Sequence, residues 1–178
     1  KPEARRVMTT ESRSPAMNFE VRRAGVLLHI TSLPGSGPCG TLGAQARSFI
    51  DFLSASGMGV WQMLPVGPTL RDRSPYQNSS THAGDPLLID LEPLVAAGWL
   101  PRMPDDDGIL AKRAALARAW RGFQELATDA ERRALAAFSQ ENAYWLPDYA
   151  LFRALRDELQ TGWWLWPVTL RERNPQAL

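Results

Sequence analysis

The sequence is poor in cysteine, has no long apolar run, and carries charges that nearly cancel. Cys39 is the single cysteine among 178 residues, so an internal disulfide is excluded and a reducing compartment is favoured. No apolar run approaches the roughly 20 residues that a membrane-spanning helix needs. Twenty basic and nineteen acidic residues leave a net charge of +1, which excludes strong electrostatic capture of nucleic acid or anionic membrane. We therefore expect a cytoplasmic protein that binds neither nucleic acid nor membrane.

Histidine is also scarce, and this removes the commonest metal sites and nucleophilic triads. His29 and His82 are the only histidines, and no spacing typical of metal ligands joins them to the single thiol. The Gly-x-Ser-x-Gly motif of serine hydrolases is absent. One glycine-rich stretch precedes a predicted helix, but it matches neither the dinucleotide fingerprint nor the Walker A motif: Gly35, Gly37, Gly40 and Gly43. We expect no metal and no cofactor.

Two short apolar runs flank an amphipathic segment in the first half of the chain. The runs at 25–30 and 60–64 are continuous rather than alternating, which is typical of strands buried on both faces of a parallel sheet. Between them, apolar residues recur every three or four positions on one helical face: Leu42, Ala46, Phe49, Ile50 and Leu53. Strand, helix and strand within about forty residues predict a right-handed βαβ unit and an α/β fold.

The loops that follow the two predicted strands, 31–41 and 65–86, are long and polar. In α/β folds the loops after the strands carry the ligand chemistry. About twenty aperiodic residues inside a compact domain are usually functional, so the second loop is the main candidate for a binding site. At 87–91 the pattern becomes extended again, and Pro93 ends it.

Glycosidic bond cleavage would require two carboxylates on either side of one bond, roughly 5–5.5 Å apart in a retaining enzyme. Four carboxylates lie in or near the second loop: Asp72, Asp85, Asp90 and Glu92. We interpret them as residues that fix the loop or face solvent, because no convincing pair emerges from their spacing. No catalytic residue is assigned in this chain.

From residue 94 onward the sequence is predicted to be almost entirely helical. We expect helices over 94–100 and 109–127, a third from a capping box at Thr128 and Glu131 to about Trp145, and a fourth opened by Pro147 and Asp148. An aromatic corner follows at 163–167. The chain therefore divides into a disordered leader and two structured parts: 1–21, 22–93 and 94–178.

Five stretches, taken in order, resemble one known family, the amylomaltases or 4-alpha-glucanotransferases of glycoside hydrolase family 77. The resemblance covers about 22–178. The stretches are Arg23-Ala-Gly-Val-Leu-Leu-His-Ile-Thr-Ser-Leu-Pro-Gly35, Trp61-Gln-Met-Leu-Pro-Val-Gly-Pro68, Ser74-Pro-Tyr-Gln77, Ala83-Gly-Asp-Pro-Leu-Leu-Ile-Asp90 and Glu141-Asn-Ala-Tyr-Trp-Leu-Pro-Asp-Tyr-Ala-Leu-Phe152.

The resemblance implies the first strands of a (β/α)8 barrel with an inserted, mostly helical subdomain. It implies transfer of α-1,4-glucan segments to glucose or glucan acceptors by a retaining double displacement without a cofactor. The expected partners are α-1,4-glucans and maltooligosaccharides. The family's catalytic carboxylates come from later strands, so the chain is expected to need the remainder of its barrel and to be inactive alone.

The resemblance also implies a substrate-binding role for Tyr76, Ser74 and Gln77, which match the family's Ser-Pro-Tyr-Gln loop. Tyr76 would place its ring against a glucose face. The chain departs from the family's pattern beside this loop, where Asp72 and Arg73 occupy the positions of the usual Gly-Asp pair. We interpret His29 and Trp61 as structural.

Two alternatives from other functional classes remain open. The chain could be a non-catalytic glucan-binding or scaffold fragment that functions as it stands, or a helical interaction module built on 94–178. The aromatic corner favours a seam between the helical insert and the barrel over a sugar platform: Trp163, Trp164 and Trp166.

Overall fold

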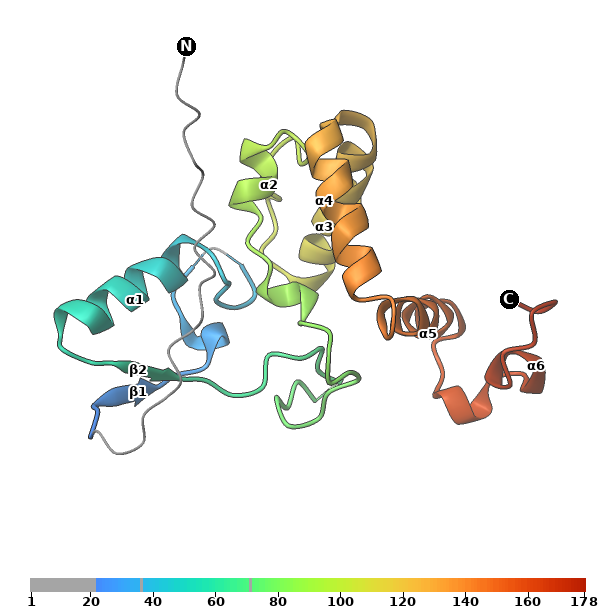
Figure 1. Ribbon diagram of the computed structural model, residues 1–178, viewed down its shortest axis with the longest axis horizontal. Helices are drawn as coiled ribbons and strands as arrows, with labels where there is room; N and C mark the ends of the chain where they lie inside the picture. Colours follow the sequence, from blue (N-terminus) through green and yellow to red (C-terminus); the bar gives the residue numbers. More distant parts are fainter. Residues whose placement is uncertain (1–21, 36, 71) are drawn as a thin grey trace, which may run out of the picture.

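The computed structural model describes residues 22–178 except 36 and 71, so the leader predicted at 1–21 lies outside the described residues. Two short strands, β1 (Gly25–Leu27) and β2 (Val60–Gln62), run parallel, and helix α1 (Ala44–Ala55) connects them (Figure 1). The strands pair with Val26 opposite Trp61. The predicted βαβ unit and the α/β class are therefore confirmed, although each strand is shorter than its apolar run.

Close backbone approach and one buried cluster hold this unit together. A Cβ atom on Gly25 would lie 2.5 Å from the carbonyl oxygen of Val60, so only glycine allows the strands to meet there. The Trp61 indole N–H donates to the carbonyl oxygen of Leu28 at 2.8 Å, and its ring packs edge-on against Phe49. The cluster beneath consists of Ile30, Leu33, Ala46 and Leu88.

The prediction that both strands are buried on two faces is wrong for the described part of the chain. Leu27 in β1 is 60% exposed, and Phe52 of α1 is 59% exposed. On the predicted apolar face of α1, Ala46 and Leu53 are buried but Ile50 is not. A two-stranded sheet with one packed helix has too little surface to cover these apolar groups.

The extended segment predicted at 87–91 is also wrong at its start, where the structure forms the 3-10 helix η2 (Pro86–Leu88). Asp85 caps this helix, because its carboxylate accepts a hydrogen bond from the Leu87 N–H at 2.9 Å. Pro86 suits the first helical position, because its fixed φ is already close to the helical value and a backbone N–H there would have no partner within the helix. A similar 3-10 turn, η1 (Ile30–Ser32), replaces the predicted end of the first strand.

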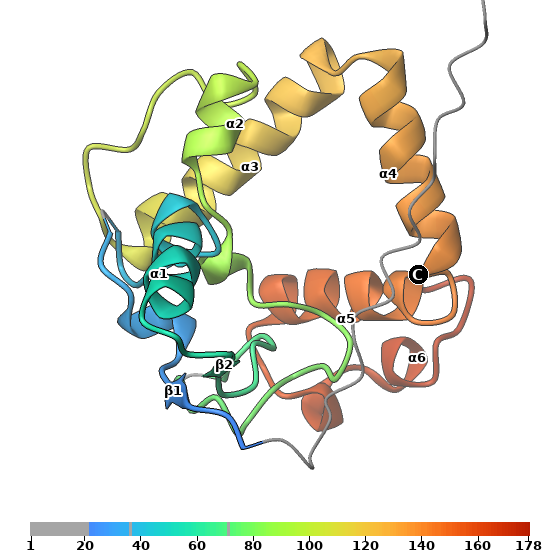
Figure 2. The same cartoon turned by 60° about the vertical axis from the view of Figure 1, so that its left-hand side comes forward.

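The second half of the described chain is helical, as predicted. It contains α2 (Glu92–Ala96), α3 (Ile109–Leu126), α4 (Asp129–Glu141), α5 (Leu146–Leu159), η3 (Trp163–Leu165) and α6 (Val168–Arg171). Figure 2 shows α3, α4 and α5 following one another with a sharp change of direction at each junction. The predicted capping box opens α4, with hydrogen bonds in both directions between Thr128 and Glu131.

Two helix ends differ from the prediction. The helix expected over 94–100 ends at Ala96, because Gly98 takes a left-handed φ of 76° and turns the chain. The helix expected to continue to about Trp145 ends at Glu141, and α5 begins at Leu146. A second buried cluster joins the α2 region to α3, and its members are Leu91, Leu100, Ala115 and Ala119.

Gly122 lies within α3 where the helix approaches the backbone after α2. A Cβ atom at this position would lie 2.1 Å from the carbonyl oxygen of Trp99. Replacing glycine by alanine inside a helix normally stabilises it by about 1 kcal/mol. We expect the opposite for Gly122→Ala, with the free energy of unfolding lowered by roughly 1–3 kcal/mol because the backbone contact must open.

Urea unfolding followed by circular dichroism measures this difference, and Gly84→Ala is the control. Gly84 does not have a left-handed φ, and no atom lies within 4 Å of its would-be Cβ. Its substitution is therefore expected to change stability by less than about 0.5 kcal/mol. A Gly122→Ala variant as stable as the parent chain would show that α3 does not pack against Trp99 as described.

Candidate functional site

The loop after β2 is closed at its base by one carboxylate. The Asp85 backbone N–H donates to the carbonyl oxygen of Val66 at 2.8 Å. Its side chain accepts from the Leu87 N–H, and also from the backbone N–H of Thr69 at 3.4 Å and the Thr69 hydroxyl at 3.3 Å. Asp85 therefore joins the two ends of the loop.

The three predicted substrate-binding residues lie together in one tight turn at the tip of this loop. The Gln77 N–H donates to the carbonyl oxygen of Ser74 at 3.1 Å, which closes the turn around Pro75 and Tyr76. The Ser74 hydroxyl oxygen accepts from the Tyr76 N–H at 3.4 Å. Thr69 and Asn78, which lie on either side of the turn in the sequence, form an isolated antiparallel β-bridge.

This turn presents Tyr76 to solvent, where the residue is 73% exposed, while Ser74 is half-buried. Gln77 is also exposed. Chemically, the turn offers a free aromatic face and polar groups within a few residues, an arrangement suited to a pyranose ring with its hydroxyl rim.

The candidate carboxylates are loop-fixing residues, as predicted for Asp72, Asp85 and Asp90. Asp72 accepts a hydrogen bond from the Ser74 N–H at 3.2 Å, and Asp90 accepts one from the Glu92 N–H at 3.1 Å. His29 is likewise engaged, because its Nδ1 accepts from the Thr31 N–H, which leaves Nε2 to donate to the carbonyl oxygen of Pro65 at 3.2 Å.

Sequence reasoning missed Lys112, which crosses from α3 to the end of the loop. The residue is only 4% exposed, and its Nζ donates to the carbonyl oxygen of Leu87 at 2.5 Å. The Cys39 thiol donates to the same oxygen at 3.8 Å. Burial lowers the pKa of Lys112 and raises the pKa of the Cys39 thiol.

The signal in the sequence was the rarity of lysine. Lys112 is one of two lysines in a chain whose other basic residues are all arginine. Lysine differs from arginine in carrying a compact point charge, whereas the guanidinium is a planar fork with five donors.

Within the described ranges, no group of three or more histidine, cysteine or acidic side chains is placed to hold a metal ion. Among those same residues, no helix is both long and apolar enough to cross a membrane.

The parallel βαβ unit, with a long polar loop after its second strand and a following helical segment, defines a portion of an α/β protein. A family model described as 4-alpha-glucanotransferase matches residues 28–178. The chain belongs to the 4-alpha-glucanotransferase family.

Individual relatives agree with this assignment. The chain is 47% identical over 171 residues to the 4-alpha-glucanotransferase of Thermus thermophilus and 36% identical over 170 residues to that of Aquifex aeolicus. These matches cover 90% and 89% of this chain and 34% of each relative. The chain thus spans about a third of the length of the curated relatives it matches.

A solved structure shows the same fold. Amylomaltase from Streptococcus agalactiae in complex with acarbose superposes with a TM-score of 0.78 at 31% identity, covering 88% of this chain and 34% of that one.

The buried lysine makes a pH-dependent contribution to stability with a defined sign. Because the pKa of folded Lys112 lies below its ordinary value of 10.5, the unfolded chain binds more protons between these two values. The free energy of unfolding contributed by this group therefore rises with pH across that window. The Cys39 thiol acts in the opposite direction above 9.0, since its folded pKa is raised.

Urea unfolding at several pH values measures this effect. We expect the free energy of unfolding of a Cys39→Ser chain to rise at alkaline pH, and that of a Cys39→Ser, Lys112→Met chain to lack this rise. Arg113→Met in the same background removes a neighbouring cation that does not titrate and serves as the control. Parallel pH profiles with and without Lys112 would mean that its ammonium remains hydrated in the folded chain.

Proposed function

We propose that this chain forms the opening third of a (β/α)8 barrel enzyme that transfers α-1,4-glucan segments to glucose or glucan acceptors. The reaction is a retaining double displacement through a glycosyl-enzyme, with the reacting carboxylates supplied by later barrel strands. The observation that carries this proposal is the family match across 28–178. The parallel strands β1 and β2 support it, because they have the pairing expected of neighbouring barrel strands.

The remainder of the barrel is needed for this activity. Apolar side chains on β1 and α1, including Leu27, Ile50 and Phe52, are exposed in the described chain. Further strands and helices would cover these groups and complete the sheet. In this organisation 22–93 is the first barrel portion and 94–178 is a helical insert. The single thiol is consistent with a cytoplasmic location.

Glucans and maltooligosaccharides bind at the tip of the loop after β2. Tyr76 lays its ring against a glucose face and directs its hydroxyl toward the sugar. The Ser74 hydroxyl and the Gln77 amide contact the sugar's hydroxyl groups. The hydrogen-bonded turn supports this role, because it holds these residues in fixed positions while leaving the Tyr76 ring exposed.

A chimera tests the role of Tyr76. In it, this chain replaces the matching third of the Thermus thermophilus relative, and disproportionation of maltotriose is measured by the release of glucose. We expect Tyr76→Ala to lower kcat/KM by about tenfold through loss of the ring contact. Tyr76→Phe retains the ring and is expected to lower it only a few-fold.

The matched control is Phe138→Ala, which removes another exposed aromatic ring from α4 and should leave transfer unchanged. If the chimera folds and is active but Tyr76→Ala has no effect, the proposed substrate role of the loop tip is wrong. An inactive but folded chimera would argue against the transferase assignment of this chain.

The chain by itself provides a second test. Incubated with maltotriose, the 178 residues are expected to release no glucose and form no longer oligomers, because the chain contains no assigned catalytic carboxylate pair. Chromatography of the products is sensitive enough to decide this, with the complete Thermus thermophilus relative as positive control. Turnover by the chain alone would locate the reacting acids among these residues.

A further inference from the structure

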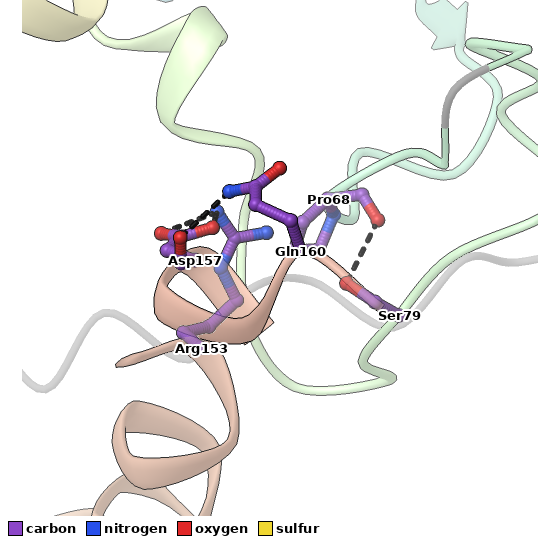
Figure 3. Close-up of polar contacts among 5 residues, drawn as sticks. All are labelled: Pro68, Ser79, Arg153, Asp157 and Gln160. Carbon is purple, nitrogen blue, oxygen red and sulfur yellow. Dashed lines mark hydrogen bonds and ion pairs between the residues drawn. The ribbon is translucent and has the colours of Figure 1, made fainter. Parts of the chain in front are cut away.

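A groove separates the loop after β2 from helices α3 and α5. Two cavities, of about 390 and 690 Å³, share Thr69, Leu70, Arg113, Arg153 and Asp157 as lining residues and so form one continuous depression. Figure 3 shows Arg153, Asp157 and Gln160 of the α5 side facing the loop segment that carries Pro68 and Ser79. Tyr76 lines neither cavity, so the groove is distinct from the proposed sugar-binding tip.

The groove concentrates positive charge in a chain that is nearly neutral. Two carboxylates line it, but Asp85 is occupied by the Thr69 and Leu87 donors, and Asp157 pairs with Arg153 at 3.4 Å. Within the described ranges, the other lining guanidinium groups have no carboxylate within ion-pair distance. Four arginines contribute to the lining: Arg73, Arg113, Arg153 and Arg156.

Two indole rings stand at one end of this basic groove. Trp163 and Trp164 are 54% and 62% exposed, and their ring planes are nearly perpendicular at 82°. The Trp164 ring folds over Gly162, where a Cβ atom would lie 2.5 Å from it. The absence of a side chain on Gly162 therefore allows the ring to occupy this place.

Unusual backbone angles also occur at the groove. Arg73 and Gln160 adopt left-handed φ values of 56° and 52°, and they are two of the three described non-glycine residues with positive φ. Both line the groove, one from the loop and one from the end of α5. Gln160 takes this conformation because it caps the C-terminus of α5, a common way for a helix to end. Arg73 lies in a loop, where a left-handed φ is unfavourable for a residue with a side chain.

We propose that this groove binds a phosphorylated sugar, namely a glucose unit carrying a phosphate monoester. Guanidinium groups recognise phosphate oxygens through paired, charge-assisted hydrogen bonds, and exposed indole faces accept the apolar face of a pyranose ring. Thr69, Ser79 and Gln160 line the larger cavity. Their donor groups are bonded within the chain, to Asp85, Pro68 and Asp157, so their oxygen atoms are the groups that would accept hydrogen bonds from sugar hydroxyls. A neutral glucan would need no such excess of cations.

This proposal shares only one element with the proposed function, namely a sugar as the ligand. It requires no part of the barrel outside this chain. Its test is therefore direct binding to the 178-residue chain, measured by isothermal titration calorimetry and by tryptophan fluorescence. The probes are glucose 6-phosphate, glucose, inorganic phosphate and maltotriose with and without a 6-phosphate. We expect glucose 6-phosphate to bind at least about tenfold more tightly than glucose or phosphate, and the affinity to fall with added salt.

Substitutions locate the site. Arg156→Gln and the pair Arg113→Met, Arg156→Gln should each weaken binding of glucose 6-phosphate, the pair by about tenfold or more. Trp164→Ala should weaken the sugar phosphate while leaving inorganic phosphate unchanged. Arg133→Met on α4 removes an exposed arginine outside the groove and is the matched control.

Each result bears on the proposal. If phosphorylated maltotriose binds more tightly, the ligand is a phosphorylated glucan. If glucose 6-phosphate binds more tightly, the ligand is a free sugar phosphate. Both results support the site.

The proposal is overturned if glucose 6-phosphate binds no more tightly than glucose, if it binds no more tightly than inorganic phosphate, or if it does not bind at all. Loss of transfer in the chimera with sugar phosphate binding intact would contradict the proposed function alone.

Discussion

The hydrogen bond from Lys112 to the Leu87 carbonyl oxygen joins the two halves of this chain. The segment that contains Leu87 contributes Leu88 to the cluster under the βαβ unit and Leu91 to the cluster under α3. Helix α3 packs against η2 at this point. Because both clusters meet in one short stretch of backbone, its position determines how the loop after β2 faces the helices. An ammonium buried at the junction holds a carbonyl that the 3-10 turn leaves without a backbone partner.

The loop after β2 therefore has two different surfaces. Its tip, with Tyr76, projects into solvent from a turn stabilised by its own backbone and side-chain hydrogen bonds. Its side, with Thr69 and Arg73, faces α5 across a groove lined by arginine and tryptophan. The Asp85 carboxylate supports both surfaces, because its hydrogen bonds to Thr69 and Leu87 join the two ends of the loop. We propose a neutral sugar as the ligand of the first surface and an anionic sugar as the ligand of the second.

Much of the local structure could be predicted from the sequence. The capping box at Thr128 and Glu131 involves residues three positions apart, so its chemistry is visible in the sequence. The apolar runs and the helical period between them were sufficient to predict a parallel βαβ unit. The family resemblance grouped Ser74, Tyr76 and Gln77 in one loop. The structure shows that they share one tight turn, and their contact with sugar is a proposal. Strand burial and the segment at 86–88 were predicted wrongly.

The sequence by itself determined the elements whose hydrogen bonds are local: the helices, their caps and the tight turn of the loop. Tertiary structure decided the rest, because the deciding contacts join residues far apart in the chain. Lys112 reaches Leu87 across 25 positions, and the indole of Trp61 reaches Leu28 across 33. Neither contact leaves a periodic trace in the sequence. The basic groove arises in the same way, since Arg73 and Arg153 become neighbours only when α5 packs opposite the loop.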